Sequence, residues 1–78
     1  MGMKYVAVST MTESGDSDVF CIDFYKPEEV VASVQDMMDE EFAWVAEFKV
    51  HCSWGQDTEI EIAKALNKAR DKAKEQQT

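Results

Sequence analysis

Apolar side chains occupy every second position between residues 42 and 54, the longest stretch of strand-favouring residues in the chain. The even positions of this stretch are Phe42, Trp44, Ala46, Phe48, Val50, Cys52 and Trp54, whereas the odd ones include Glu47, Lys49, His51 and Ser53. Because successive side chains of a strand point to opposite faces, this alternation predicts a strand with one buried and one solvated face. We expect Trp54, at its end, to be the last core residue; the alternative is an exposed anchor for a partner.

Two shorter segments before it show the same alternation. In residues 3–12 one face carries Val6, Val8 and Thr10, and the other carries Tyr5, Ala7, Ser9 and Met11. In residues 19–25 the apolar row consists of Phe20, Ile22 and Phe24. The polar segment between them, residues 13–18, contains Gly15 and is typical of a turn. The two segments therefore predict a β-hairpin.

The first predicted helix begins at Pro27, because proline presets the backbone angle of the first helical position. Glu28 and Glu29 follow in the first turn, where the helix dipole favours anions. Apolar residues then recur at three- and four-residue spacing, namely Val30, Val34 and Met37, with Val31 and Met38 beside them. The helix is expected to end after Met38 without a glycine cap.

A second helix is predicted after Gly55, with its start left open between two positions. Thr58 and Glu61 fit a capping box, but Ser53 with Gln56 would cap a helix that starts earlier. Its apolar stripe consists of Ile62, Leu66, Ala69 and Ala73. The stripe thins to alanine, so residues 75–78 are expected to form a frayed tail.

These elements give the order β-β-α-β-α. Both helices must cover the same sheet face, because the other face carries charged and polar groups, among them Asp23, Glu47, Lys49 and His51. The fold class is thus a two-layer α+β sandwich. A right-handed crossover allows the third strand to lie beside the first, which gives an antiparallel-type sheet of order 2-1-3; order 1-2-3 is the alternative.

Length and composition fit one globular domain. The chain has 78 residues, of which 45% are hydrophobic, and we assign residues 3–74 to a single domain with residues 1–2 as a cloning remnant. No apolar run approaches the roughly 20 residues needed to cross a bilayer, and the N-terminus lacks the apolar core of a secretory signal. A cytoplasmic location is therefore expected.

Charge is distributed unevenly along the chain, whose formal net charge is −8. Residues 63–78 carry five basic and two acidic side chains, a net charge of +3, so residues 1–62 carry −11. An acidic body repels phosphate and favours cationic partners, so we expect no direct binding of nucleic acid and none of membranes. The same charge also keeps a small protein soluble.

No motif in the sequence predicts a catalytic, metal or cofactor site. Cys21, His51 and Cys52 are potential metal ligands, but His51 and Cys52 are adjacent on a strand and leave opposite faces. Cys21 and Cys52 also belong to opposite faces, so two free thiols are expected. Cys21 and His51 could share the open face, yet no third group is evident that would orient them for catalysis. The chain is therefore not expected to be an enzyme or to hold a cofactor.

Partner binding is the more promising chemistry, and two groups of residues are candidates for it. The open sheet face mixes aromatic, small and charged residues, with Tyr5, Tyr25 and Val45 as anchors and Glu47 and His51 beside them. The second group is the acidic cluster at the end of the first helix, where anions oppose the helix dipole: Asp36, Asp39, Glu40 and Glu41.

The function expected from these features is that of a small, acidic, non-catalytic protein-interaction module. It would bind another protein, or itself as a homodimer, through the open sheet face or a sheet edge. The alternative is an acidic decoy or inhibitor that occupies a basic, nucleic-acid-binding surface of a target protein. No internal repeat or linker modifies this interpretation.

Overall fold

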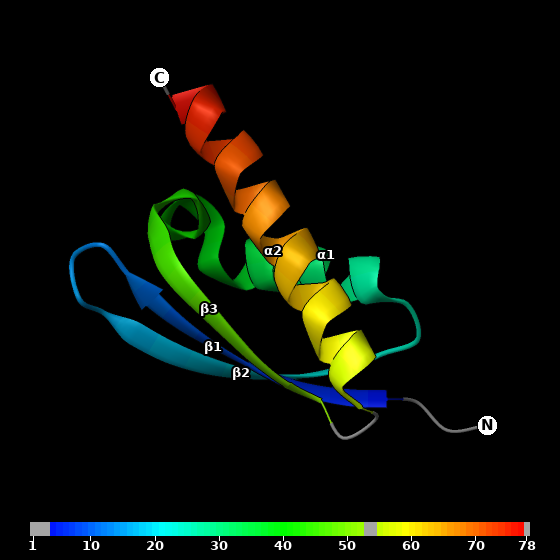
Figure 1. Cartoon of the computed structure of the whole chain (residues 1–78). Helices are drawn as coiled ribbons and strands as arrows, with labels where there is room; N and C mark the ends of the chain where they lie inside the picture. Colours follow the sequence, from blue (N-terminus) through cyan, green and yellow to red (C-terminus); the bar gives the residue numbers. More distant parts are fainter. Residues whose placement is uncertain (1–3, 53–54, 78) are drawn as a thin grey trace.

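The computed structural model describes residues 4–52 and 55–77. Along these residues the elements are β1 (Lys4–Thr12), β2 (Ser17–Phe24), α1 (Pro27–Met38), a short 3₁₀ helix η1 (Asp39–Trp44), β3 (Val45–Cys52) and α2 (Gln56–Gln77) (Figure 1). The predicted order β-β-α-β-α is confirmed, with η1 as an addition between α1 and β3.

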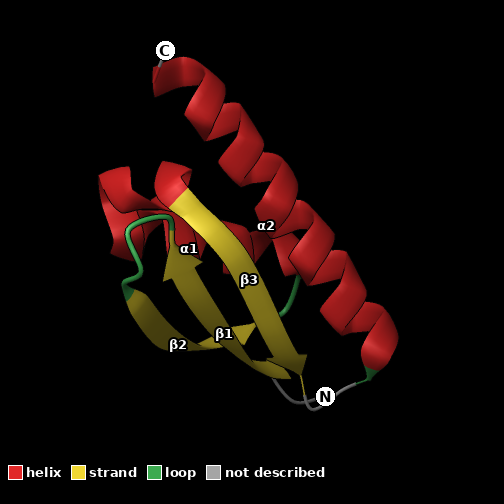
Figure 2. Cartoon of the chain, turned by 60° about the vertical axis from the view of Figure 1, so that its left-hand side comes forward, coloured by secondary structure: helices red, strands yellow, loops and turns green. Residues whose placement is uncertain are grey.

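The strands form an antiparallel sheet in the order β2-β1-β3, as predicted. The central strand pairs Ala7 with Cys21 on one side and with His51 on the other. Both helices lie on the same face of this sheet and leave the other face open (Figure 2). The chain is therefore a two-layer α+β sandwich.

The core lies between the sheet and the two helices. Its buried residues come from the sheet, from α1 and α2 and from η1: Val6, Val8, Ile22, Phe24, Val45, Phe48 and Cys52; Val30, Val34, Met38, Ile62 and Leu66; and Phe42. Ala69 and Ala73 pack partly against this core. One residue of the apolar stripe predicted for the first helix does not face the core: Met37 is 50% exposed, and Met38 is buried instead.

The start of the third strand departs from the predicted alternation. Phe42 and Trp44 belong to η1 rather than to a strand, and β3 begins only at Val45. Opposite β1, Met11 pairs with Glu47 but Thr12 pairs with Val45, so Ala46 is an extra residue that forms a β-bulge.

This bulge reverses the faces of the residues before it. Val45 is only 2% exposed, whereas Trp44 is 43% exposed and Ala46 is also exposed. The prediction that Val45 lies on the open face, and Trp44 and Ala46 in the core, was therefore wrong. Side chains alternate between the two faces of a strand, so one inserted residue moves the residues before it to the opposite face. After the bulge the predicted faces are confirmed, with Phe48 buried and Glu47 exposed.

The first helix begins at Pro27, as predicted. The backbone amides of Lys26 and Tyr25 donate to the Oε1 atom of Glu29, at 2.9 Å and 2.6 Å, and so satisfy groups that a helix start would leave unpaired. The helix ends at Met38 and is followed by Asp39, whose φ of 55° lies in the region that favours glycine. The chain then passes directly into η1.

The second helix begins at Gln56, immediately after Gly55, which has a φ of 118°. Thr58 thus lies inside the helix, and the capping box with Glu61 was wrong. Ser53 and Trp54, for which a cap and a core position were predicted, lie outside the described residues. The helix continues to Gln77, into the segment expected to fray, and its end projects beyond the sheet (Figure 1).

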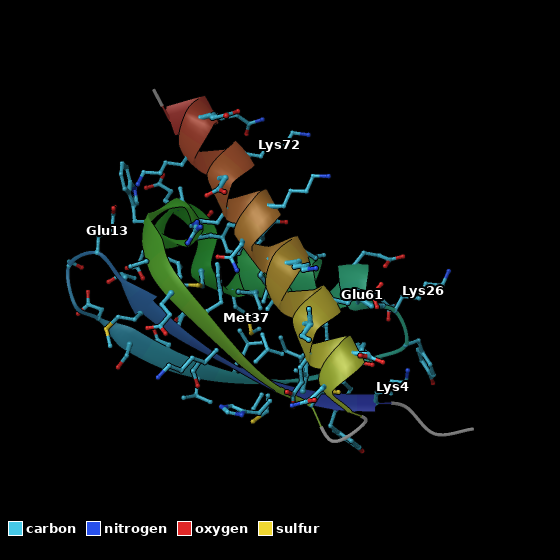
Figure 3. The ribbon with its side chains drawn as sticks, viewed as in Figure 1. Lys4, Glu13, Lys26, Met37, Glu61 and Lys72 are labelled. Carbon is cyan, nitrogen blue, oxygen red and sulfur yellow. The ribbon has the colours of Figure 1, made fainter. Side chains whose placement is uncertain are left out.

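The hairpin turn and the projecting part of α2 both carry charged side chains. Glu13 lies at the hairpin turn, whereas Lys72 lies on the projecting part of α2 (Figure 3). Neither helix in the described ranges combines the length and the apolar character that are needed to cross a membrane.

Candidate functional site

The open sheet face consists of cross-strand rows that the two registers define. One row contains Cys21, Ala7 and His51, and the next contains Val19, Ser9 and Lys49. Four of the predicted partner-binding residues, Tyr5, Tyr25, Glu47 and His51, are exposed, while Val45 is buried beneath this face. Tyr25 follows the end of β2, where the chain turns into α1.

Cys21 and His51 share the open face, but β1 separates their strands. Since neighbouring strands lie about 4.8 Å apart, the Cα atoms of these residues are roughly 10 Å from each other. A thiol and an imidazole need a contact of about 3 Å for the histidine to act as a base. Both side chains line a shallow hollow on this face with Tyr5 and Ala7, but no hydrogen bond joins them in the described part of the chain.

The two cysteines lie as the sequence predicts. Cys21 is exposed and Cys52 is buried, and both are free thiols. Within residues 4–52 and 55–77, no group of three or more histidine, cysteine, aspartate or glutamate side chains is arranged to hold a metal ion.

The four residues of the predicted acidic cluster are all exposed, and two of them line different hollows. Asp36 lies in a hollow beside β2, whereas Glu41 lies in a different hollow beside the hairpin turn. Asp39 and Glu40 are exposed between them, in the first turn of η1. The sequence placed Asp39 and Glu40 only at the end of the first helix. In the structure they follow α1 and also form the first turn of η1.

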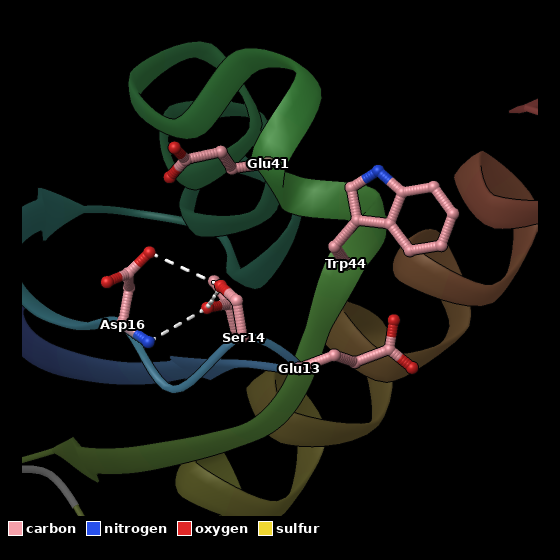
Figure 4. A pocket seen from close by; sticks show the side chains of 6 residues that line it. Glu13, Ser14, Asp16, Glu41 and Trp44 are labelled. Atoms are coloured by element: carbon pink, nitrogen blue, oxygen red, sulfur yellow. Dashed lines mark hydrogen bonds between the residues drawn. The ribbon is translucent and has the colours of Figure 1, made fainter.

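The hollow beside the hairpin turn has a volume of about 290 Å³ and lies between Trp44 and Asp16 (Figure 4). Its polar groups are largely paired with one another. The backbone amide of Asp16 donates to the hydroxyl of Thr12 at 3.0 Å, and the hydroxyl of Ser14 donates to the carboxylate of Asp16 at 3.3 Å. These bonds fix the turn.

The cationic partner of this hollow comes from α2. The ammonium group of Lys74 lies 3.1 Å from a carboxylate oxygen of Glu13 and 5.6 Å from the centre of the Trp44 ring. Both contacts are of the kind that favours a cation. Lys74 thus joins the end of α2 to the hairpin turn and η1.

The outer edge of β3 is covered by side chains of α2. The backbone amide of Cys52 donates to Glu59 at 2.9 Å, and the guanidinium of Arg70 donates to the carbonyl of Val45 at 3.0 Å. Arg70 also lies 5.8 Å from the centre of the Phe48 ring. Helix α2 therefore runs along β3 and forms hydrogen bonds with backbone groups at the first and the last residue of this strand.

The outer edge of β2 has no such cover. The amide of Thr12 donates to the carbonyl of Asp16 at 2.8 Å, so even-numbered residues of the hairpin turn their backbone groups toward each other. Odd-numbered residues of β2 must then point their amides and carbonyls outward: Ser17, Val19, Cys21 and Asp23. Within the described residues these groups have no hydrogen-bond partner.

A hollow of about 340 Å³ lies next to this open edge, between β2 and α1. From α1 it is lined by Ser33, Asp36 and Met37, and from β2 by Cys21, Ile22 and Asp23. The lining includes two carboxylates and no basic group. The open edge is therefore bordered by negative charge and by the half-exposed side chain of Met37.

Sequence reasoning missed the residues that make the two edges different. Nothing in the spacing of Glu59 or Arg70 marks them as partners of β3, although Arg70 is the only arginine in the chain. Because the guanidinium group presents several donors in a fixed geometry, a single arginine among lysines is weak evidence that it binds several acceptors at once. Trp44 was missed as an exposed residue because the bulge has no signature in the sequence.

Comparison with known proteins adds no functional assignment, since no family model, curated protein or solved structure matches this chain.

Proposed function

We propose that this chain is a non-catalytic interaction module that binds a partner polypeptide as an additional strand along β2. The observation that carries the proposal is the contrast between the two sheet edges. On β3, Glu59 and Arg70 bind outward backbone groups, whereas the corresponding groups of β2 have no partner in the described chain.

An uncovered strand of eight residues is a template for pairing. Proteins usually protect such an edge with charged side chains, a proline or a bulge. The β2 strand contains no proline and pairs with β1 without a register shift, and its only charged residues are two aspartates. Backbone hydrogen bonds would provide affinity, and the side chains on either side would provide specificity. Edge addition also leaves the core unchanged.

The open sheet face is a less suitable surface on its own. Its exposed apolar residues, such as Tyr5 and Val19, are interspersed with charged ones, and the loss of Val45 to the core removes one of its three expected anchors. An extended partner on β2 would still contact the edge of this face through Val19 and Cys21.

The acidic-decoy alternative has weaker support. It requires Asp36, Asp39, Glu40 and Glu41 to act together on one basic surface, but Asp36 and Glu41 line separate hollows. Only Asp36 borders the β2 edge.

A titration with a neutral strand-forming peptide tests the proposal. The probe is an acetylated and amidated heptapeptide, Thr-Gln-Gln-Thr-Val-Val-Thr, and the readout is the shift of each backbone amide signal in ¹⁵N-labelled protein. We expect the largest shifts at the outward amides of Val19, Cys21 and Asp23. Shifts centred on the helices instead would overturn the proposal.

Two variants at one position sharpen this test. Cys21→Pro removes an outward amide on an edge strand, where proline is tolerated, and should abolish peptide binding. Cys21→Val removes the thiol, keeps the amide and should bind as the unmodified chain does. Equal binding by the proline and valine variants would contradict edge pairing.

A further inference from the structure

We infer that the partner segment runs antiparallel to β2, is basic where it passes Asp23 and is apolar where it passes Val19. This inference rests on the proposed function, because it specifies the sequence that the open edge accepts. It follows from what the edge offers on its two sides.

On the helical side, the edge changes from apolar at Phe20 to acidic beside Ile22, and the exposed Asp18 adds a further carboxylate near the hairpin turn. Phe20 is only partly buried against the core, so a side chain opposite it would cover apolar surface. Opposite Ile22 lies the hollow with Asp36 and Met37. A lysine or arginine there could lay its aliphatic stem on Met37 and bring its charged head to Asp36.

On the open side the same order is repeated. Val19 is 67% exposed and offers an apolar neighbour, whereas Asp23 is an exposed carboxylate. Directly opposite residues in a strand pair lie close enough for opposite charges and apolar groups to interact. Both sides therefore favour apolar residues near Val19 and basic residues near Asp23.

Read from its N-terminus, a segment antiparallel to β2 passes Asp23 first and Val19 last. Its sequence then reads basic, basic, any residue, apolar, apolar. Antiparallel pairing is slightly more stable per residue than parallel pairing, and it matches the rest of this sheet.

A second copy of the chain does not provide such a segment. Its own β2 reads SDVFCIDF, which contains no basic residue. Each copy also carries a net charge of −8, so two copies repel each other electrostatically. A basic partner is favoured by the same charge that opposes the homodimer.

The test compares peptides that differ only in these positions. The probe Thr-Lys-Lys-Thr-Val-Val-Thr, acetylated and amidated, should bind about threefold or more tightly than the Gln-Gln peptide at low ionic strength, and the Glu-Glu peptide should bind more weakly than both. The reversed order, Thr-Val-Val-Thr-Lys-Lys-Thr, should lose much of this gain. Dissociation constants come from the amide shifts of β2.

Asp36→Asn should reduce the advantage of the Lys-Lys peptide by about half or more, because one of its two carboxylate contacts is lost. Glu40→Gln, which makes the same charge change in η1 away from both hollows, should leave it unaltered. Equal affinity of the Lys-Lys and Gln-Gln peptides, with shifts still at β2, would overturn this inference but not the proposed function. Absence of shifts at β2 with every peptide would overturn both. A dimer in light scattering that Cys21→Pro converts to a monomer would identify the second copy as occupant and overturn the basic segment.

Discussion

The carboxylate of Glu59 accepts a hydrogen bond from the backbone amide of Cys52 across 2.9 Å. Seven positions separate the two residues in the chain, and the bond joins the first turn of α2 to the last residue of β3. Together with Arg70 at the other end of the strand, it makes α2 a cover for this edge of the sheet. The outward backbone groups of β3 are thus bound by α2, whereas those of β2 remain available to a partner strand.

Removing this carboxylate should destabilise the fold. Glu59→Ala leaves the outward amide of Cys52 without its partner, and we expect the free energy of unfolding to fall by about 1–2 kcal/mol, measured by urea denaturation. Asp57→Ala is the matched control, because it removes a neighbouring first-turn carboxylate that has no hydrogen bond to the described part of the chain. Its loss should be at most about 0.5 kcal/mol. Equal losses would show that the bond to Cys52 contributes nothing.

The bulge at Ala46 predicts effects of very different size for two adjacent substitutions. Val45→Asp places a charge in the core, where Val45 is 2% exposed, and should lower the free energy of unfolding by about 3 kcal/mol or more. Ala46→Asp adds the same carboxylate at an exposed position and should change it by less than about 1 kcal/mol. Circular dichroism during thermal unfolding measures both. A strict alternation without the bulge requires the reverse order, since Ala46 would then be the buried residue.

Two threonines at the end of β1 provide a second matched pair. The hydroxyl of Thr10 is buried and has no hydrogen-bond partner among the described residues, so Thr10→Val should stabilise the protein by about 1 kcal/mol. The hydroxyl of Thr12 accepts a bond from the amide of Asp16, so Thr12→Val should destabilise it by about the same amount. Denaturant midpoints that move in the same direction for both variants would contradict this account of β1.

The start of α1 should respond to pH through Glu29. Hydrogen bonds from the backbone amides of Lys26 and Tyr25 hold the pKa of the Glu29 carboxyl below its ordinary value. The folded state thus favours the ionised form. Its stabilisation is complete above the pKa of glutamate in the unfolded chain, about 4.3, and is lost as the pH falls through the lower folded pKa.

Glu29→Gln should therefore be less stable than the unmodified chain at neutral pH, and the difference should shrink as the pH falls below about 4. Glu28→Gln is the control, because this exposed neighbour in the same turn forms no such bonds. Unfolding curves at a series of pH values measure both variants. A difference for Glu29→Gln that stays constant down to pH 2 would refute the assignment.

Local patterns were sufficient for much of this fold. The alternation of apolar residues predicts β1, β2 and most of β3, and the stripe of Ile62 and Leu66 predicts the buried face of α2. Pro27 sets the start of α1. Each of these features depends on near neighbours in the chain, so the sequence contains the necessary information.

The candidate site was accessible only in part. The sequence places Tyr5, Glu47 and His51 on the exposed face, since their positions follow from the same alternation. It gives no warning that an extra residue at Ala46 turns Val45 inward and Trp44 outward, because a bulge depends on which residues of two strands are paired.

What the sequence alone determined is therefore which side of most elements is apolar, and from that the two-layer arrangement; it favoured strand order 2-1-3 over 1-2-3, and the structure decided between them. Only the tertiary structure decided which strand edge is covered. Glu59 and Arg70 reach β3 because α2 folds back along that strand, whereas no element of the described chain reaches the outward groups of Val19 and Cys21. The physical reason is that the hydrogen bonds that cover a strand edge join segments distant in the chain. The periodicity of apolar residues within one segment does not predict such contacts.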